Sequence, residues 1–291
     1  MRLFNFRVKP ESDVVLKDWP TRIDPIYQTK QHYSELLQQQ ITSMRDWQNK
    51  LYAENRQALL IVFQAMDAAG KDSAIKHVMS GLNPQGCQVY SFKHPSSEEL
   101  DHDFLWRTTQ CLPERGRIGI FNRSYYEEVL VLRVHPELLS AQGAVCVNSD
   151  TERFWQDRYE SILNLEKHLW LNGTRIIKFF LHLSKQEQCD RLLKRIDQAE
   201  KNWKFSLDDL KERDCWQRYQ DAYERCLSAT STKYSPWYVI PADDKANARL
   251  LIADLVVDTL RDMNPEYPKL DAQQQHNLQL AKVKLLKEKT R

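Results

Sequence analysis

The stretch of residues 64–73 combines residue types that bind phosphate. Gly70 and Lys71 close a short turn that follows the apolar run 58–63 and precedes a segment with helical character. A strand, a tight turn ending in Gly-Lys and a helix form the layout of a phosphate-binding P-loop, where backbone N–H groups and the helix dipole favour an anion. We therefore predict phosphoryl chemistry here, with Lys71 as a catalytic cation. The predicted phosphate-binding residues of this loop are Ala68, Ala69, Gly70, Asp72 and Ser73.

This turn departs from the usual P-loop pattern. Ala65 stands where the first glycine is expected, and the hydroxyl of Ser73 comes one place late. The plain alternative is a strand–helix turn with a surface lysine. A carboxylate at Asp67 would repel phosphate, so we interpret Asp67 either as a ligand of phosphate-bound Mg²⁺ or as a base toward an incoming hydroxyl.

Bulk composition limits the function classes. The 291 residues carry 42 basic and 40 acidic side chains, a net charge of +2, so any polyanion site must be local and nucleic acid is not an expected partner. No apolar run approaches the ~20 residues that span a bilayer, so no membrane partner is expected. The six cysteines form no CxxC pair, which favours reduced thiols and a cytoplasmic protein.

The hydrophobic pattern alternates between strands and helices, which predicts an α/β fold with a parallel sheet covered on both faces. The predicted strands are 58–63, 87–92, 118–121, 175–183 and 237–240. The predicted helices are 71–80, 97–110, 124–131, 152–172, 185–198, 207–229 and 245–261. Because ligands of such sheets bind at the carboxyl ends of the strands, the rest of the site is expected there.

The flanking segments differ from this core. Residues 1–29 are predicted to be an arm on the surface, and the spacing of apolar residues over 30–53 predicts an amphipathic helix packed on the main domain. The tail after Pro268 is polar and predicts a helix or a frayed end. We divide the chain into residues 1–56, a kinase-like domain over 57–268, and a tail over 269–291.

A second polar segment follows the predicted strand 118–121. Asn122 occupies the place where P-loop enzymes often carry a metal-linked aspartate, and Arg123 is suited to bidentate contact with phosphate. The plain alternative is a helix start with Ser124 as N-cap and Glu127 as its capping-box partner. Arg133 is further along, as a phosphate ligand or as a solvated arginine.

Two more segments supply bases. Lys93 falls at the end of the predicted strand 87–92, and Arg107 either folds back to phosphate or is exposed. A capping box of Ser96 and Glu99 explains the acids between them. The run 191–204 is basic and is either a solvated helix face or a mobile cover that excludes water during phosphoryl transfer. Its predicted lid bases, within a lid of about 185–215, are Arg191, Lys194, Arg195, Lys201 and Lys204.

The ordered set of motifs resembles the family-2 polyphosphate kinases over about residues 57–261. The motifs are Asp67-Ala68-Ala69-Gly70-Lys71-Asp72, Phe121-Asn122-Arg123-Ser124, Leu193-Lys194-Arg195 through Asn202-Trp203-Lys204, and Pro236-Trp237-Tyr238. The resemblance implies a thymidylate kinase-like P-loop fold with a helical lid. It also implies Mg²⁺-dependent, reversible transfer of the terminal phosphate of inorganic polyphosphate to nucleotides. In that family the positions of Asp67 and Lys71 lie at the reacting phosphates, those of Arg123 and Arg133 on phosphate groups, and that of Arg195 in the lid.

The resemblance also bears on the acceptor. The family usually carries Asp at the position of Asn122, and members with Asn there and Glu at the position of Glu127 resemble the subgroup that accepts both AMP and ADP and produces ATP. Family members are often homo-oligomers, so we expect one here.

Two other function classes remain open from the sequence. One is a conventional kinase that uses ATP to phosphorylate a nucleotide or small metabolite, and the other is a nucleotide-binding scaffold without activity. The many bases near the predicted sheet edge favour a larger polyanion as donor, and intact Asp67, Lys71 and Arg123 argue against a scaffold. Turnover of AMP with polyphosphate in the absence of ATP separates the three.

Overall fold

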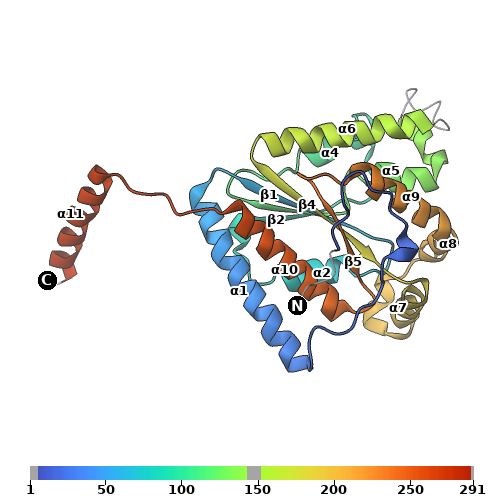
Figure 1. The fold of residues 1–291 in the computed structure, drawn as a ribbon, viewed down its shortest axis with the longest axis horizontal. Helices are drawn as coiled ribbons and strands as arrows, with labels where there is room; N and C mark the ends of the chain where they lie inside the picture. The colour runs from blue at the N-terminus through green and yellow to red at the C-terminus, as the bar shows by residue number, and fades with distance from the viewer. Residues whose placement is uncertain (1–5, 143–151, 290–291) are drawn as a thin grey trace.

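The computed structural model describes residues 6–142 and 152–289, and these form a parallel five-stranded sheet with helices on both faces (Figure 1). The spatial order is β2-β3-β1-β4-β5, and every neighbouring pair is parallel. Each predicted strand is confirmed to within one residue. The strands are β1 (Ala58–Gln64), β2 (Cys87–Ser91), β3 (Ile118–Asn122), β4 (Thr174–His182) and β5 (Trp237–Pro241).

The helices pack as two layers. One hydrophobic cluster joins the sheet to α1, α2 and α10, and a second joins the other face to α5, α6 and α9. All seven residues of the central strand β1 are buried between these layers, as a strand covered on both faces requires. The helices are α1 (Lys30–Glu54), α2 (Lys71–Val78), α3 (Ser97–Leu100), α4 (Trp106–Thr109), α5 (Glu127–Val134), α6 (Glu152–Leu171), α7 (Lys185–Asp197), α8 (Asp208–Asp214), α9 (Trp216–Thr230), α10 (Lys245–Met263) and α11 (Ala272–Lys289).

Two predicted helices are wrong in their continuity. The segment 97–110 forms the separate helices α3 and α4, because the Asp103 carboxylate accepts a hydrogen bond from the backbone of Leu105 and starts a new turn. The capping box of Ser96 and Glu99 that begins α3 is confirmed. The segment 207–229 is divided into α8 and α9 at Cys215, where no proline or glycine marks a break.

The first residues correct the expectation of a surface arm. Phe6 and Val8 bond to β5, with Val239 N donating to the Phe6 carbonyl and Val8 N to the Trp237 carbonyl, both at 2.9 Å. The open edge of β5 offers these backbone groups, and Phe6, Val8 and Leu16 are buried in the core as a result.

The C-terminal helix α11 lies apart from the sheet, at the end of an extended connection (Figure 1). Its residues are exposed throughout. In the part of the chain that the structure describes, no helix has both the length and the apolar character needed to cross a bilayer.

Candidate active site

The P-loop turn leaves the carboxyl end of β1 and bends sharply into α2. Gly70 has a φ of +102° and Ala68 one of +62°, so two residues of the turn occupy the left-handed region. Lys71 then begins α2, and its Nζ folds back over the turn to donate to the Ala65 carbonyl at 2.6 Å. The pKa of Lys71 is lowered to about 8, mainly by burial and secondly by the positive charge of the nearby Arg123. The charge of Asp67 acts in the opposite direction.

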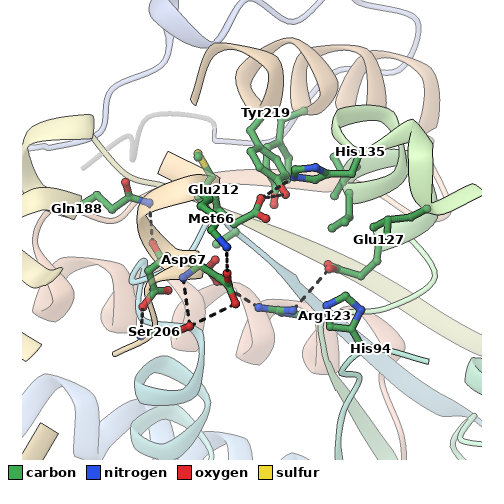
Figure 2. Close-up of a pocket in the computed structure, with 18 of the residues that line it drawn as sticks. Met66, Asp67, His94, Arg123, Glu127, His135, Gln188, Ser206, Glu212 and Tyr219 are labelled. Atoms are coloured by element: carbon green, nitrogen blue, oxygen red, sulfur yellow. Dashed lines mark hydrogen bonds and ion pairs between the residues drawn. The ribbon is translucent and has the colours of Figure 1, made fainter. Parts of the chain in front are cut away.

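A second turn, between β3 and α5, presents Arg123. Its φ is +64°, a strained conformation for a residue with a side chain, of a kind that costs about 1–3 kcal/mol. Arg123 N donates to the Phe63 carbonyl at 3.0 Å, which ties this turn to β1. The guanidinium lies 3.1 Å from the Asp67 carboxylate and 3.9 Å from that of Glu127 (Figure 2).

The capping alternative for this turn is not what the structure shows. Ser124 is buried, and its hydroxyl accepts from Gln64 Nε2 and from Tyr126 N, each at 3.1 Å, while Tyr126 itself precedes α5. The Glu127 side chain faces Arg123 rather than the backbone of Ser124. Burial raises the pKa of Glu127, and the charges of Arg123 and Lys71 oppose that rise.

A cleft at the carboxyl edge of the sheet has two halves. The first, here called the basic lobe, has a volume of about 700 Å³ and is lined by nine lysines and arginines but only three aspartates. The bases come from the P-loop, the strand ends and the lid. They are Lys71, Lys93, Arg123, Arg191, Lys194, Arg195, Lys201, Lys204 and Lys245.

The second half, here called the acidic lobe, has a volume of about 660 Å³ (Figure 2). Six carboxylates line it, against two permanent cations, Arg123 and Lys211. The carboxylates are Asp67, Glu127, Glu137, Asp208, Asp209 and Glu212. Apolar and aromatic side chains complete its wall, among them Met66, Leu130 and Tyr219. Asp67, Arg123 and Asp209 line both lobes, so the lobes meet at the Asp67–Arg123 pair.

The predicted lid bases fall into two groups. Lys194, Arg195, Lys201 and Lys204 line the basic lobe from α7 and the 3₁₀ helix that follows it. Arg191 also borders this lobe but is only 5 % exposed, because its guanidinium donates to backbone carbonyls. Its acceptors include the carbonyls of Ala69 at 2.7 Å and Ala242 at 2.6 Å, so it joins α7 to the P-loop and to the end of β5.

The predicted loop residues contact one another in the basic lobe. Asn122 Nδ2 donates to the Asp72 carboxylate at 2.7 Å. The Ser73 hydroxyl accepts from Arg249 at 2.6 Å. Lys93, Asn122, Asp72 and Ser73 all line the basic lobe, as do the loop residues Ala68, Ala69 and Gly70.

Two predicted phosphate ligands lie outside both lobes. Arg107 is buried, donates to the Lys93 carbonyl at 2.8 Å and borders a smaller cavity beside Arg123 and Glu127. Arg133 lies 3.0 Å from the Glu152 carboxylate and 5.1 Å from the centre of the Trp155 ring. The structure therefore brings neither guanidinium into the cleft, and that of Arg133 is directed toward α6.

Several cleft residues have no counterpart in the sequence-based predictions. Lys245 follows β5 and could have been found by the rule that placed Lys93, since both come after a strand end. Gln188 Nε2 donates to the Asp67 carbonyl at 3.0 Å, and Tyr219 donates to the Glu212 carboxylate at 2.5 Å. These two lie on helices whose pattern indicates only packing, so no sequence signal identifies them.

The donor set for a metal is sparse. Among residues 6–142 and 152–289, no group of three or more His, Cys, Asp or Glu side chains is arranged to hold a metal ion. Asp67 remains a suitable single donor, since its side chain is 32 % exposed at the junction of the lobes. One carboxylate fits Mg²⁺, which commonly takes one or two protein carboxylates and completes its shell with phosphate oxygens and water.

A P-loop after the central strand of a parallel sheet ordered 2-3-1-4-5, with a cleft beneath a basic helical cover, defines a P-loop kinase-like phosphotransferase. The family model described as polyphosphate kinase 2 matches residues 27–268. The chain belongs to the polyphosphate kinase 2 family.

Named relatives match nearly the whole chain. It is 57 % identical to the ADP-polyphosphate phosphotransferase of Rhodopseudomonas palustris, across 97 % of this chain and 98 % of that protein. It is 42 % identical to the AMP/ADP-polyphosphate phosphotransferase of Meiothermus ruber, across 90 % and 94 %. The crystal structure of polyphosphate kinase 2 from Arthrobacter aurescens TC1 superimposes with a TM-score of 0.84 at 36 % identity, covering 95 % of each chain.

Proposed function

We propose that this protein transfers the terminal phosphoryl group of inorganic polyphosphate to AMP and ADP, giving ADP and ATP, reversibly and with Mg²⁺. The division of the cleft by charge carries this proposal. A long polyanion suits a lobe with nine cations, and a nucleoside suits a lobe with apolar and aromatic walls whose carboxylates repel phosphate. The acceptor's terminal phosphate would then meet the donor at Asp67 and Arg123.

The residues at this junction match the needs of phosphoryl transfer, which relies on positioning and on neutralised charge rather than on covalent help. Lys71 and the loop amides bind the transferring phosphoryl group. Arg123 lines both lobes and can contact donor and acceptor at once. When bound, Mg²⁺ would be held by Asp67 and phosphate oxygens and would add positive charge there.

The use of AMP depends on Asn122 and Glu127. The two relatives named above differ on this point, since one is named for ADP alone and the other for AMP and ADP. Glu127 is supplied by the first turn of α5 and lines the acidic lobe beside Arg123. We propose that it compensates for the phosphate that AMP lacks, because its carboxylate would orient water or help to hold Mg²⁺.

The decisive experiment incubates the protein with AMP and polyphosphate in the absence of ATP and separates the nucleotides by ion-exchange chromatography. We expect ADP first and ATP later, no product from Lys71→Met, and no product in EDTA without added Mg²⁺. Starting from ATP and short polyphosphate tests the reverse reaction. Product from AMP only when ATP is the donor would replace the proposal with an ATP-dependent kinase, and no product from either donor would favour a scaffold.

Two further expectations complete the proposal. We infer a cytoplasmic location, which the cysteines support, because those at 87, 111, 189, 215 and 226 are free thiols and Cys146 lies outside the described residues. We also infer a homo-oligomer, as the family resemblance suggests. Light scattering coupled to size-exclusion chromatography tests the latter, and a monomer mass at working concentration would contradict it.

A further inference from the structure

A buried network of side chains lies behind the turn that carries Arg123. Lys178 on β4 and Glu166 on α6 are fully buried and form an ion pair with an N–O distance of 2.7 Å. The hydroxyls of Tyr125 and Tyr126 donate to the other oxygen of Glu166 at 2.9 and 2.8 Å. Lys178 Nζ also donates to the Tyr126 hydroxyl at 2.8 Å and to the Thr230 carbonyl at 2.9 Å. The three ammonium protons and both carboxylate oxygens are thus all used.

Stability alone is a weak reason for such a network. Removing two charges from water costs much of what their attraction returns, and apolar side chains of similar size are often as stable in their place. Neither Lys178 nor Glu166 lines either lobe of the cleft. What the network does achieve is a connection from β4, α6 and α9 to the two tyrosines, which directly follow Arg123 and Ser124 in the chain.

The turn requires restraint from more than one side. Arg123 has a backbone φ of +64°. A residue with a side chain keeps this strained backbone conformation only where the surrounding structure holds it. On the side of β1, the Phe63 carbonyl binds Arg123 N and Gln64 binds the Ser124 hydroxyl. On the other side, the two tyrosine hydroxyls are held by Glu166. The turn is therefore fixed from both sides while the guanidinium reaches the Asp67 carboxylate.

We propose that the Lys178–Glu166 pair, acting through the hydroxyls of Tyr125 and Tyr126, is a positioning element for Arg123 at the junction of the two lobes. The inference rests on the proposed function in that Arg123 acts during phosphoryl transfer. Without this restraint the substrates still bind, but the Arg123 guanidinium is displaced from the position that it needs when charge develops on the phosphoryl group in the transition state. The pair therefore affects turnover more than binding.

The test is the double variant Tyr125→Phe/Tyr126→Phe, which keeps both rings and the ion pair but removes the two hydroxyls. We expect kcat with ADP and polyphosphate to fall about tenfold and both KM values to stay within about twofold. Tyr27→Phe is the control, since it removes a tyrosine–carboxylate bond of the same kind, to Asp244 at 3.0 Å, away from this turn; bond for bond it matches the single variant Tyr125→Phe. A kcat within about twofold of wild type in the double variant would overturn the proposal. So would an equal loss in the control.

A mutant cycle with Arg123→Lys separates positioning from general destabilisation. If the tyrosines act through Arg123, removing their hydroxyls costs no further kcat once Arg123 is replaced, whereas additive losses would overturn the proposal. Should the double variant not fold, Tyr125→Phe alone carries the same test, because it leaves the bond between Lys178 and Tyr126 in place. A wild type without turnover on polyphosphate would overturn the proposed function, whereas an active wild type with an unaffected variant overturns only the positioning role.

Discussion

The basic lobe and the acidic lobe meet at Asp67 and Arg123 but have opposite charge. Nine cations face three carboxylates in the first, and two cations face six carboxylates in the second. The whole chain carries only +2, so its composition conceals this contrast. The fold creates it by bringing the P-loop, the strand ends and the first part of the lid, which is α7 and the 3₁₀ helix after it, to one side of the Asp67–Arg123 pair. The rest of the lid, α8, lines the other side together with α5 and α9. The local distribution of charge over the cleft therefore indicates the class of substrate, whereas the net charge of the chain does not.

The largest expected effect follows from removing the cation of the P-loop. Lys71→Ala should lower kcat/KM with polyphosphate at least about a hundredfold, since a lost transition-state contact of about 3 kcal/mol gives that factor. Asp67→Asn at the junction should have a comparable effect. Lys76→Ala is the matched control, because Lys76 is exposed on the same helix. Near-normal rates for both site variants, measured by ADP consumption, would contradict a catalytic role for the P-loop.

The lid side of the basic lobe should respond next. Arg195→Ala and Lys204→Ala should slow turnover by roughly tenfold and change nucleotide binding little, because both side chains line the basic lobe and neither lines the acidic lobe. Steady-state kinetics and calorimetry with ADP measure the two effects, with Lys185→Ala, an exposed position at the start of α7, as control. Weaker ADP binding with unchanged kcat would show that these bases form a binding surface for the nucleotide.

Salt should separate the two lobes without any substitution. Contacts between a long polyanion and many bases release counterions, so the apparent affinity for polyphosphate should fall about tenfold between low and physiological salt, by analogy with nucleic acid. The KM for AMP or ADP should change much less, because the acidic lobe, which we propose holds their nucleosides, is lined by carboxylates and apolar side chains. Parallel, shallow slopes for both substrates would argue against an extended polyanion track.

The pH dependence tests Lys71 individually. Burial lowers the pKa of Lys71 to about 8, so its ammonium form is present below that pH and is lost as the pH rises through it. The value of kcat/KM for polyphosphate should then fall about tenfold per pH unit above the pKa. Burial also lowers the pKa of Lys245, on the same lobe, to about 8. Lys71→Arg should abolish the alkaline decline and Lys245→Arg should leave it, and the reverse pattern would assign the decline to Lys245.

The sequence predicts the sheet well because each strand is a short apolar run between polar segments, and the strand ends then locate Lys71, Lys93 and Arg123. It does not predict the acidic lobe. Asp208 and Glu212 fall within the single predicted helix 207–229, and they line the lobe only because that segment breaks at Cys215 into α8 and α9. Glu212 then contacts His135, the residue that follows α5, at 3.0 Å. Arg133 illustrates the opposite error, in which a residue predicted to bind phosphate lies outside the cleft. Its guanidinium packs on the Trp155 ring of α6 instead.

The smallest expected effect concerns the choice between AMP and ADP. Glu127 borders Arg123 in the acidic lobe, and its carboxylate does not cap α5. Glu127→Gln keeps the shape and removes the charge, so it should lower kcat/KM with AMP about fivefold more than with ADP, a difference of about 1 kcal/mol. The melting temperature of this variant should change little, because the first turn of α5 does not depend on the Glu127 side chain.

Glu128→Gln on the same turn is the wrong control, since Glu128 is paired with Arg158 at 3.0 Å. Glu137→Gln, at an exposed carboxylate of the same lobe, is a better one. Equal losses on AMP and ADP would remove Glu127 as the basis for AMP use and leave ADP as the acceptor that this cleft is built for.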